Sequence, residues 1–203
     1  THVAGIIAAS RKNLIGMDGI AANVKIMALR AVPNGDERDK DIALAVRYAA
    51  DNGAHIINMS FGKAYSPYKA EVDAAFEYAA SKGVLLVHAA GNSAKNIDGG
   101  KNNFPNSYKM ASVWRVNSIP NWIEVAANTK DLGLNLPASF TNYGEEAATI
   151  FAPGRSIYST IPGNAYAAFS GTSMACPVVA GVASLLMSEF PTMTSTGARA
   201  ILL

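Results

Sequence analysis

Cysteine is almost absent from this sequence, which has only Cys176 among its 203 residues. A single cysteine excludes a disulfide bond within the chain and any metal site built from several cysteines. A strong excess of one charge is also lacking, because the sequence has 17 lysine and arginine residues and 15 acidic ones. So small an excess gives no indication of a nucleic-acid or anionic membrane partner. The apolar runs are short and interrupted by glycine, asparagine or charge, so no segment is expected to span a bilayer.

What the sequence does have is hydrophobic content for one substantial core. Half of the residues are hydrophobic, and the length predicts a single domain over residues 1–203. The chain begins at Thr1 without a signal-peptide pattern, and its first predicted helix starts at His2. A last short helix is predicted to begin near Thr194 or Ser195 and to run to the final residue. We therefore expect a partial domain that is cut at both ends.

Short apolar runs alternate with helical patterns along the first half of the chain. A helix is predicted from Asp36 or Asp39 to Asn52, and another carries Val72 and Phe76 on its inner face. Strands are predicted at residues 25–32, 55–60, 84–87, 123–127, 149–151 and 156–160. This alternation predicts an α/β fold with a doubly wound, mostly parallel sheet and helices on both faces.

A stretch of small residues from Phe169 to Pro177 leads directly into an apolar segment with helical spacing. Ser170, Thr172 and Ser173 are all acceptable N-caps, and Pro177 is expected near the first turn. Ser173 is thereby placed at or beside the helix N-terminus, where unpaired N–H groups can bind an anion. Taken alone, the stretch is an ordinary helix start, for which a capping serine is the commoner explanation.

In a doubly wound sheet, functional groups collect where strands end and the following helices begin. A serine nucleophile also needs a base, donors for the developing oxyanion and a surface for the substrate. Four stretches could supply these groups: His2, Ser60-Phe61-Gly62, Ala89-Ala90-Gly91-Asn92 and Gly171-Thr172-Ser173. Histidine comes first and serine last, in G-T-S-M-A rather than G-x-S-x-G, which disfavours an α/β-hydrolase.

Four motifs in these stretches carry a resemblance. Thr1–Gly5 resembles the end of the subtilisin family's H-G-T-H-V-A-G, and Asn58–Gly62 resembles its N-M-S-L-G. Ala89–Asn92 is similar to its A-A-G-N, and Gly171–Pro177 to its G-T-S-M-A-x-P. Weaker similarities lie at residues 139–144 and 152–154. The matches follow the family's order over nearly the whole chain, which implies a subtilisin-like fold missing its N-terminal strand or strands.

The resemblance implies a serine endopeptidase that acts through an acyl-enzyme. Ser173 would be the nucleophile, His2 the general base, and Asn92 an oxyanion donor together with the backbone N–H of Ser173. Thr172 would assist as a further donor. The implied peptide-binding residues are Ser60, Phe61 and Gly62, which would pair with an extended substrate, and Ala89, Ala90 and Gly91, which would line one pocket wall. Phe61 and Lys63 depart from the family's usual leucine and glycine, so side-chain preference is not predicted.

The family's triad aspartate is missing from these motifs. It lies on an early strand upstream of the histidine, and no carboxylate of this chain stands in a matching motif. Asp18, Asp36, Asp39 and Asp41 are interpreted as surface or helix-cap residues. Loss of this aspartate lowers the turnover of subtilisin itself by roughly 3 × 10⁴. We expect the parent protein to be an endopeptidase and residues 1–203 alone to be nearly inactive.

Cofactors and partners follow from the same resemblance. No organic cofactor is required, and no metal site is expected here; calcium in the parent is left open. The loop from Arg11 to Asp18 offers only Asn13 and Asp18 as oxygen-bearing side chains, too few for calcium. The expected partners are a polypeptide substrate and, in addition, a pro-segment or other parts of the parent chain, with no nucleic acid and no membrane. The family is largely secreted, which implies an extracellular or extracytoplasmic location.

Two other functions stay open. A catalytically inactive subtilisin-like binding or structural module would explain the missing aspartate, although His2, Asn92 and Ser173 argue for a working site. A nucleotide-binding domain is disfavoured, because neither G-x-G-x-x-G nor G-x-x-x-x-G-K follows any predicted strand. His55 and His88 are interpreted as structural, and Cys176 as buried packing.

Overall fold

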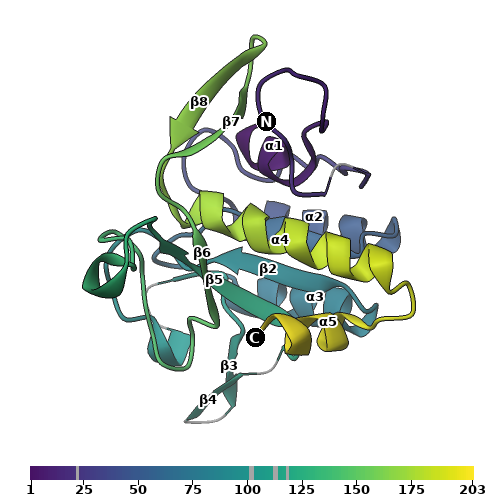
Figure 1. The fold of residues 1–203 in the computed structure, drawn as a ribbon. Helices are drawn as coiled ribbons and strands as arrows, with labels where there is room; N and C mark the ends of the chain where they lie inside the picture. Colours follow the sequence, from purple (N-terminus) through teal and green to yellow (C-terminus); the bar gives the residue numbers. More distant parts are fainter. Residues whose placement is uncertain (22, 101–102, 112–113, 118) are drawn as a thin grey trace.

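The computed structural model describes residues 1–21, 23–100, 103–111, 114–117 and 119–203. Its centre is a four-stranded parallel sheet in the order β1-β2-β5-β6 (Figure 1). The strands are β1 (Ile56–Met59), β2 (Leu85–Ala89), β5 (Trp122–Asn128) and β6 (Ile150–Pro153). The predicted parallel α/β sheet is confirmed.

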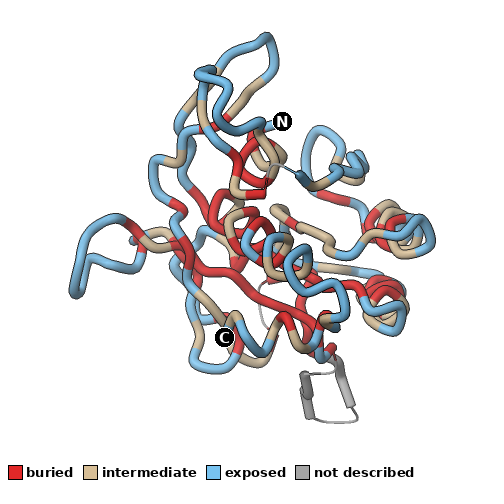
Figure 2. The backbone as a smooth tube through the Cα atoms, turned by 45° about the vertical axis from the view of Figure 1, so that its right-hand side comes forward, coloured by how far each residue is buried: buried red, intermediate tan, exposed pale blue. Residues whose placement is uncertain are grey.

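Helices cover both faces of this sheet (Figure 1). One face carries α1 (His2–Ala8), α4 (Thr172–Glu189) and α5 (Ser195–Leu202), and the other carries α2 (Asp39–Asp51) and α3 (Lys69–Ser81). Successive strand residues point to opposite faces, so Leu85 and Val87 pack toward α4 whereas Leu86 packs toward α3. Every residue of β2 is therefore buried, as the tube in Figure 2 shows for the middle of the molecule.

Two antiparallel hairpins complete the fold. One joins β3 (Tyr108–Ala111) to β4 (Trp114–Asn117), and the other joins β7 (Ile157–Ile161) to β8 (Ala165–Phe169). Short 3₁₀ helices occupy Asp98–Gly100 and Gly133–Asn135. The sequence did not predict β3, β4 or β8. The β7–β8 hairpin matters for the site because α1 lies against β7.

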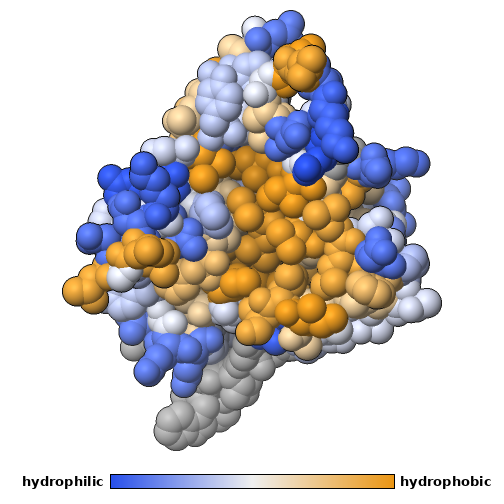
Figure 3. All heavy atoms as spheres, in the orientation of Figure 1, coloured by the Kyte–Doolittle hydropathy of each residue, from blue (hydrophilic) through white to orange (hydrophobic). Residues whose placement is uncertain are grey.

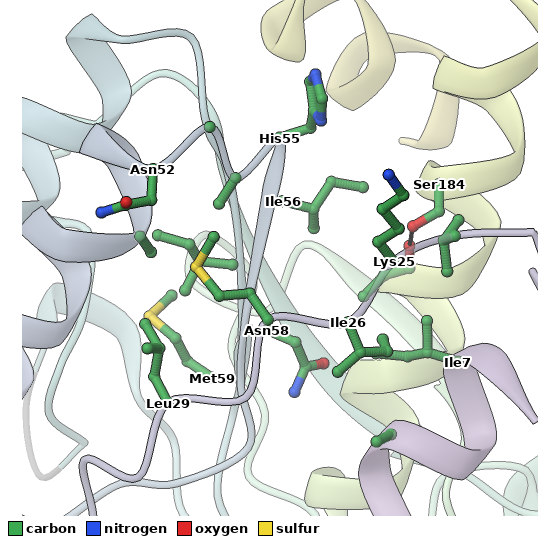
Figure 4. Close-up of a pocket in the computed structure, with 18 of the residues that line it drawn as sticks. Ile7, Lys25, Ile26, Leu29, Asn52, His55, Ile56, Asn58, Met59 and Ser184 are labelled. Carbon is green, nitrogen blue, oxygen red and sulfur yellow. Dashed lines mark hydrogen bonds between the residues drawn. The ribbon is translucent and has the colours of Figure 1, made fainter.

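The prediction of a strand at residues 25–32 is wrong, because this segment pairs with no strand among the described residues. A cleft of about 1020 Å³ separates it from β1, whose outer edge has no partner in the described sheet. Figure 4 shows side chains of both segments facing this space. Ile26, Met27 and Leu29 are more than a third exposed there. Residues 25–32 therefore have a sequence typical of a strand but no adjacent strand among the described residues with which to form β-sheet hydrogen bonds.

Four predictions about helix starts and membrane spans need correction. Gly171 is the N-cap of α4 and has no side chain with which to cap it, whereas α2 is preceded by Arg38 rather than by an aspartate cap. Pro177 lies inside α4, beyond its first turn, so the carbonyl of Ser173 loses an i+4 donor. Among the described residues, α4 is long and apolar enough by composition to cross a membrane. Half of it is buried within the protein, as in an ordinary core helix.

Candidate active site

His2 lies in the first turn of α1 and is buried against the β7–β8 hairpin. Its ring stacks on Phe169 with centroids 4.5 Å apart, and its Nε2 lies 3.1 Å from the carbonyl oxygen of Ala167. The hydroxyl of Ser159 donates to the backbone carbonyl of His2. A Cβ at Gly5 would lie 2.3 Å from Thr160 Oγ1, so glycine lets α1 approach the hairpin this closely. These contacts fix the position of the ring.

The hydrogen bonds of His2 also fix where its proton lies. A carbonyl oxygen can only accept, so Nε2 must carry the hydrogen that is shared with Ala167. The other ring nitrogen, Nδ1, is buried and has no hydrogen-bond partner among the described residues. In every protonation state that makes the Ala167 bond, Nε2 is unable to take a proton from a nucleophile. The ring is thus held in a state that cannot act as a base through Nε2.

Ser173 is the second residue of α4, at the end where the helix N–H groups lack intrahelical acceptors. Its hydroxyl donates to the carbonyl oxygen of Ser60, 3.1 Å away. The structure thus brings the predicted nucleophile into contact with Ser60–Gly62, the predicted peptide-binding segment that follows the end of β1 and is called the peptide-binding strand below. It gives no hydrogen bond between Ser173 and His2.

Asn92 follows β2 and faces the start of α4. Its Oδ1 accepts from the backbone N–H of Thr172 at 2.8 Å and from the Thr172 hydroxyl at 3.1 Å. A backbone N–H can only donate, and the oxygen is the only acceptor of the Asn92 amide, so that oxygen must face Thr172. The Nδ2 donor is thereby directed away from Thr172, and no hydrogen bond joins it to another of the described residues. The Thr172 hydroxyl in turn accepts from the N–H of Gly91, which closes the link between the two loops.

Asn142 supports this arrangement and was not singled out from the sequence. Its Oδ1 accepts from the N–H groups of Ser93 and Lys95, and its Nδ2 donates to the carbonyl of Ala90. A Cβ at Gly91 would lie only 2.5 Å from Nδ2, and Gly91 has a φ of 96°. Asn142 therefore holds both ends of the turn that presents Asn92. The weak similarity at residues 139–144 was the sequence feature that could have pointed to Asn142.

The peptide-binding candidates lie at the ends of β1 and β2. Phe61 accepts a hydrogen bond at its carbonyl from the Nε2 of His88, 2.9 Å away. Beyond Gly62, the backbone of Lys63 exchanges two hydrogen bonds with Phe104. Ala89 and Ala90, at the end of β2, are almost completely buried.

The charged side chain that follows Ser60–Gly62, that of Lys63, forms an ion pair. The Lys63 ammonium lies 2.6 Å from Asp39 Oδ1. Burial acts to raise the pKa of Asp39, but Lys63 and the N–H of Tyr68 outweigh it, so the pKa is lowered. Burial raises the pKa of Glu37 despite the nearby Lys63. Lys63, which departs from the family pattern, thus ties the peptide-binding strand to the start of α2.

The cleft beside β1 is lined by Asn58, which also has an unpaired polar atom. Asn58 donates through Nδ2 to the Ser60 hydroxyl, while its buried Oδ1 has no partner among the described residues. Asn58 lines the cleft together with Val3, Ala4 and Ile7 of the helix that carries His2. The unpaired Nδ1 of His2 and Oδ1 of Asn58 thus belong to elements that border one cleft.

Other titratable groups give no second catalytic centre. Cys176 is fully buried with Sγ 3.3 Å from the carbonyl of Val87, and burial raises the pKa of its thiol. Asp18, in the loop from Arg11 to Asp18, accepts from the N–H of Lys12. Within the part of the chain that the structure describes, no cluster of three His, Cys, Asp or Glu side chains could hold a metal ion. His55 is exposed, whereas His88 is completely buried.

Known proteins are similar to this chain in sequence and in structure. The sequence model of the subtilase family matches residues 1–203. The chain is 42% identical over 190 residues to the thermophilic serine proteinase of Bacillus sp. (strain AK1), covering 93% of this chain and 42% of that protein. It is 36% identical over 202 residues to subtilisin DY of Bacillus licheniformis, covering 98% of this chain and 66% of that protein.

A solved structure also resembles this one closely. Sphericase superimposes with a TM-score of 0.84 at 32% identity, over 100% of this chain and 67% of that chain. The chain thus spans less than half of the AK1 proteinase and about two thirds of subtilisin DY.

Proposed function

Because the chain belongs to the subtilase family, we propose that it provides the nucleophile, the base and the oxyanion donors of a serine endopeptidase. The relatives that share its sequence are named as serine proteinases and subtilisins. The observation that carries the proposal is the orientation of Asn92. Its oxygen is fixed by Thr172, so its free Nδ2 is presented beside the N-terminus of α4, which carries Ser173.

The proposed reaction uses these groups in order. Ser173 Oγ attacks the peptide carbonyl and gives its proton to Nε2 of His2. The resulting oxyanion accepts hydrogen bonds from Asn92 Nδ2 and from the Ser173 N–H. His2 then returns the proton to the leaving amine as the acyl-enzyme forms. Water attacks the acyl-enzyme by the same route and releases the acid.

His2 can do this only if its hydrogen moves from Nε2 to Nδ1. A carboxylate placed at Nδ1 would bind that hydrogen and free Nε2 from Ala167. The described residues place no such group there. We infer that the carboxylate comes from a segment outside residues 1–203, and that these residues alone are nearly inactive.

The cleft offers a place for that segment. It lies between the free edge of β1 and residues 25–32, its walls expose apolar side chains, and α1 borders it. An added strand would pair with β1 and would give residues 25–32 the neighbour that they lack. We propose that a strand of the parent protein fills the cleft and carries the carboxylate toward Nδ1 of His2. Residues 1–203 are then part of one larger domain.

Substrate, location and cofactors are proposed from the same basis. An extended peptide would pair with Ser60–Gly62, with Ala89–Gly91 as the facing wall. The relatives include a subtilisin and alkaline proteases of bacilli, which supports an extracellular location. The reaction as proposed needs no organic cofactor, and a pro-segment is a further partner to be sought in the parent protein.

Labelling with a fluorophosphonate tests the proposal. The full-length protein is expected to be modified at Ser173, as located by mass spectrometry, and to cleave a denatured protein substrate. Ser173→Ala should abolish both, and His2→Ala should slow both by several orders of magnitude. A folded full-length protein that neither labels nor cleaves would overturn the proposal.

One observation favours a second candidate, a catalytically inactive binding module. Both reacting groups are engaged elsewhere, Nε2 of His2 with Ala167 and Oγ of Ser173 with Ser60. In such a module, the full-length protein would bind peptide and leave Ser173 unlabelled. The same labelling experiment therefore separates the two functions.

A further inference from the structure

His88 and Glu124 form a buried pair in the middle of the sheet. They are register partners on β2 and β5, and both point to the face covered by α3. His88 is 0% exposed and Glu124 is 4% exposed. Nδ1 of His88 lies 2.8 Å from Oε1 of Glu124. A histidine and a glutamate buried this deeply are costly unless each polar atom is satisfied.

The hydrogen bonds of this pair reach the peptide-binding strand. The carbonyl of Phe61 can only accept, so Nε2 of His88 carries a hydrogen and donates to it across 2.9 Å. Glu124 accepts from the indole N–H of Trp122 at 2.7 Å through its other oxygen, Oε2. One further hydrogen is shared between His88 Nδ1 and Glu124. Wherever that hydrogen lies, the pair has no net charge.

The carboxylate of Glu124 also binds Asn103, which lies near Gly91 at the end of β2. Asn103 donates through Nδ2 to Glu124 Oε1 at 3.0 Å, which turns its Oδ1 in the other direction. A Cβ built on Gly62 would lie 3.3 Å from that oxygen, and a Cβ built on Gly91 would lie 3.2 Å from it. The Asn103 amide therefore lies between the end of the peptide-binding strand and the end of β2.

We propose that Glu124 and His88 are positioning residues for the peptide substrate. Glu124 holds Ser60–Gly62 in place through His88, which donates to the carbonyl of Phe61. Glu124 also holds the Asn103 amide, which lies between Gly62 and Gly91. The pair thus sets the separation of the two segments between which the substrate side chain would lie. This inference rests on the proposed function for the identity of the ligand, a peptide in extended conformation.

Binding to a catalytically silent protein tests the proposal without requiring activity. In the full-length Ser173→Ala protein, the Kd of a synthetic peptide substrate is measured by fluorescence anisotropy. Adding His88→Val removes the donor to Phe61, and the Kd is expected to rise about 10- to 100-fold. His88→Gln keeps an N–H donor and should recover most of this affinity. Glu124→Gln should weaken binding about 10-fold, whereas Glu145→Gln, the same change at an exposed site, should leave the Kd unchanged.

A second readout separates positioning from a general structural role. In the Ser173-containing protein, a small fluorophosphonate does not use the peptide-binding strand, so its labelling rate should change less than twofold in His88→Gln and Glu124→Gln. The KM for peptide should rise in Glu124→Gln with kcat nearly constant. Unchanged Kd values in all three variants would overturn the proposal, as would labelling and binding that fall together. Absence of labelling in the unsubstituted protein would count against the proposed function alone, since the Kd series would still decide the role of the pair.

Discussion

At the scale of single residues, the proposed catalysis depends on where a few hydrogens lie. Thr172 fixes the Asn92 amide, Ala167 fixes the hydrogen of His2, and Phe61 fixes that of His88. Each assignment follows from a partner that can act only as donor or only as acceptor. A single substitution can therefore remove one donor or one acceptor and test its part in catalysis.

Asn92→Ala in the full-length protein removes the free amide donor without touching the nucleophile. We expect kcat to fall by about 10²- to 10³-fold with little change in KM, the size of effect found for the oxyanion asparagine of subtilisin itself. Steady-state hydrolysis of a chromogenic peptide measures this, and Asn34→Ala, at an exposed turn position, is the control. A kcat within a few-fold of the parent would contradict the role of Asn92.

Asn142→Ala should loosen the turn that presents Asn92. One buried and two partly buried hydrogen bonds are lost, each worth about 1 kcal/mol net, so the free energy of unfolding should fall by about 3 kcal/mol. Urea denaturation followed by tryptophan fluorescence measures the change. A loss well below 1 kcal/mol would show that the turn holds its shape without Asn142.

The four motifs were enough to identify the candidates His2, Asn92 and Ser173, because each is a short local pattern. The His88–Glu124 pair was missed because its two members are 36 residues apart and meet only through the parallel pairing of β2 and β5. His88 was interpreted simply as structural. Sequence gives no local signal for such a contact.

At the scale of elements, loops far apart in the chain are tied together by single carboxylates. Asp98 accepts from the N–H groups of Glu145, Glu146 and Ala147, each at about 3 Å. Burial acts to raise the pKa of Asp98, but these donors together outweigh it, and the pKa is lowered below its ordinary value of 3.8. The loop after β2 is thereby joined to the segment that precedes β6.

This tie predicts a pH-dependent stability. A lowered carboxyl pKa stabilises the folded protein above the unfolded-state value, and the contribution is lost as pH falls through the folded-state pKa. Asp98→Asn should therefore lower the free energy of unfolding by about 1–2 kcal/mol near neutral pH. The difference from the parent should stay constant down to about pH 5 and shrink below about pH 4. Urea titrations across this range check it, and a difference that grew toward acid pH would contradict the assignment.

Predicted elements succeeded where the pattern was local and failed where pairing decided the outcome. The helix carrying Val72 and Phe76 and the buried strand at β2 follow directly from their spacing. Residues 25–32 have the composition of a β-strand but form no β-ladder, because no strand of the described sheets lies beside them to pair with. The alanine-rich β8 lacks β-branched residues, yet pairs with β7 through a turn in which Gly163 and Asn164 both have positive φ. Gly-Asn was the signal that could have indicated this hairpin.

At the scale of the whole molecule, two surfaces show apolar residues without a cover. One is the cleft between β1 and residues 25–32 (Figure 4). The other is a broad hydrophobic face over α4, visible in Figure 3, where Val182 and Leu185 are more than a third exposed. Apolar faces of this extent normally meet another surface. Both are consistent with our proposal that residues 1–203 are one part of a larger domain.

The central claim is that Ser173 and His2 react only when a carboxylate-bearing strand fills that cleft. The most direct test compares fluorophosphonate labelling rates of Ser173 in the full-length protein and in residues 1–203, with circular dichroism used to verify that the shorter chain is folded. We expect the full-length protein to be labelled faster by roughly 10⁴-fold, the order of the loss when the triad aspartate is removed from subtilisin. Equal labelling rates in the two folded proteins would contradict the claim.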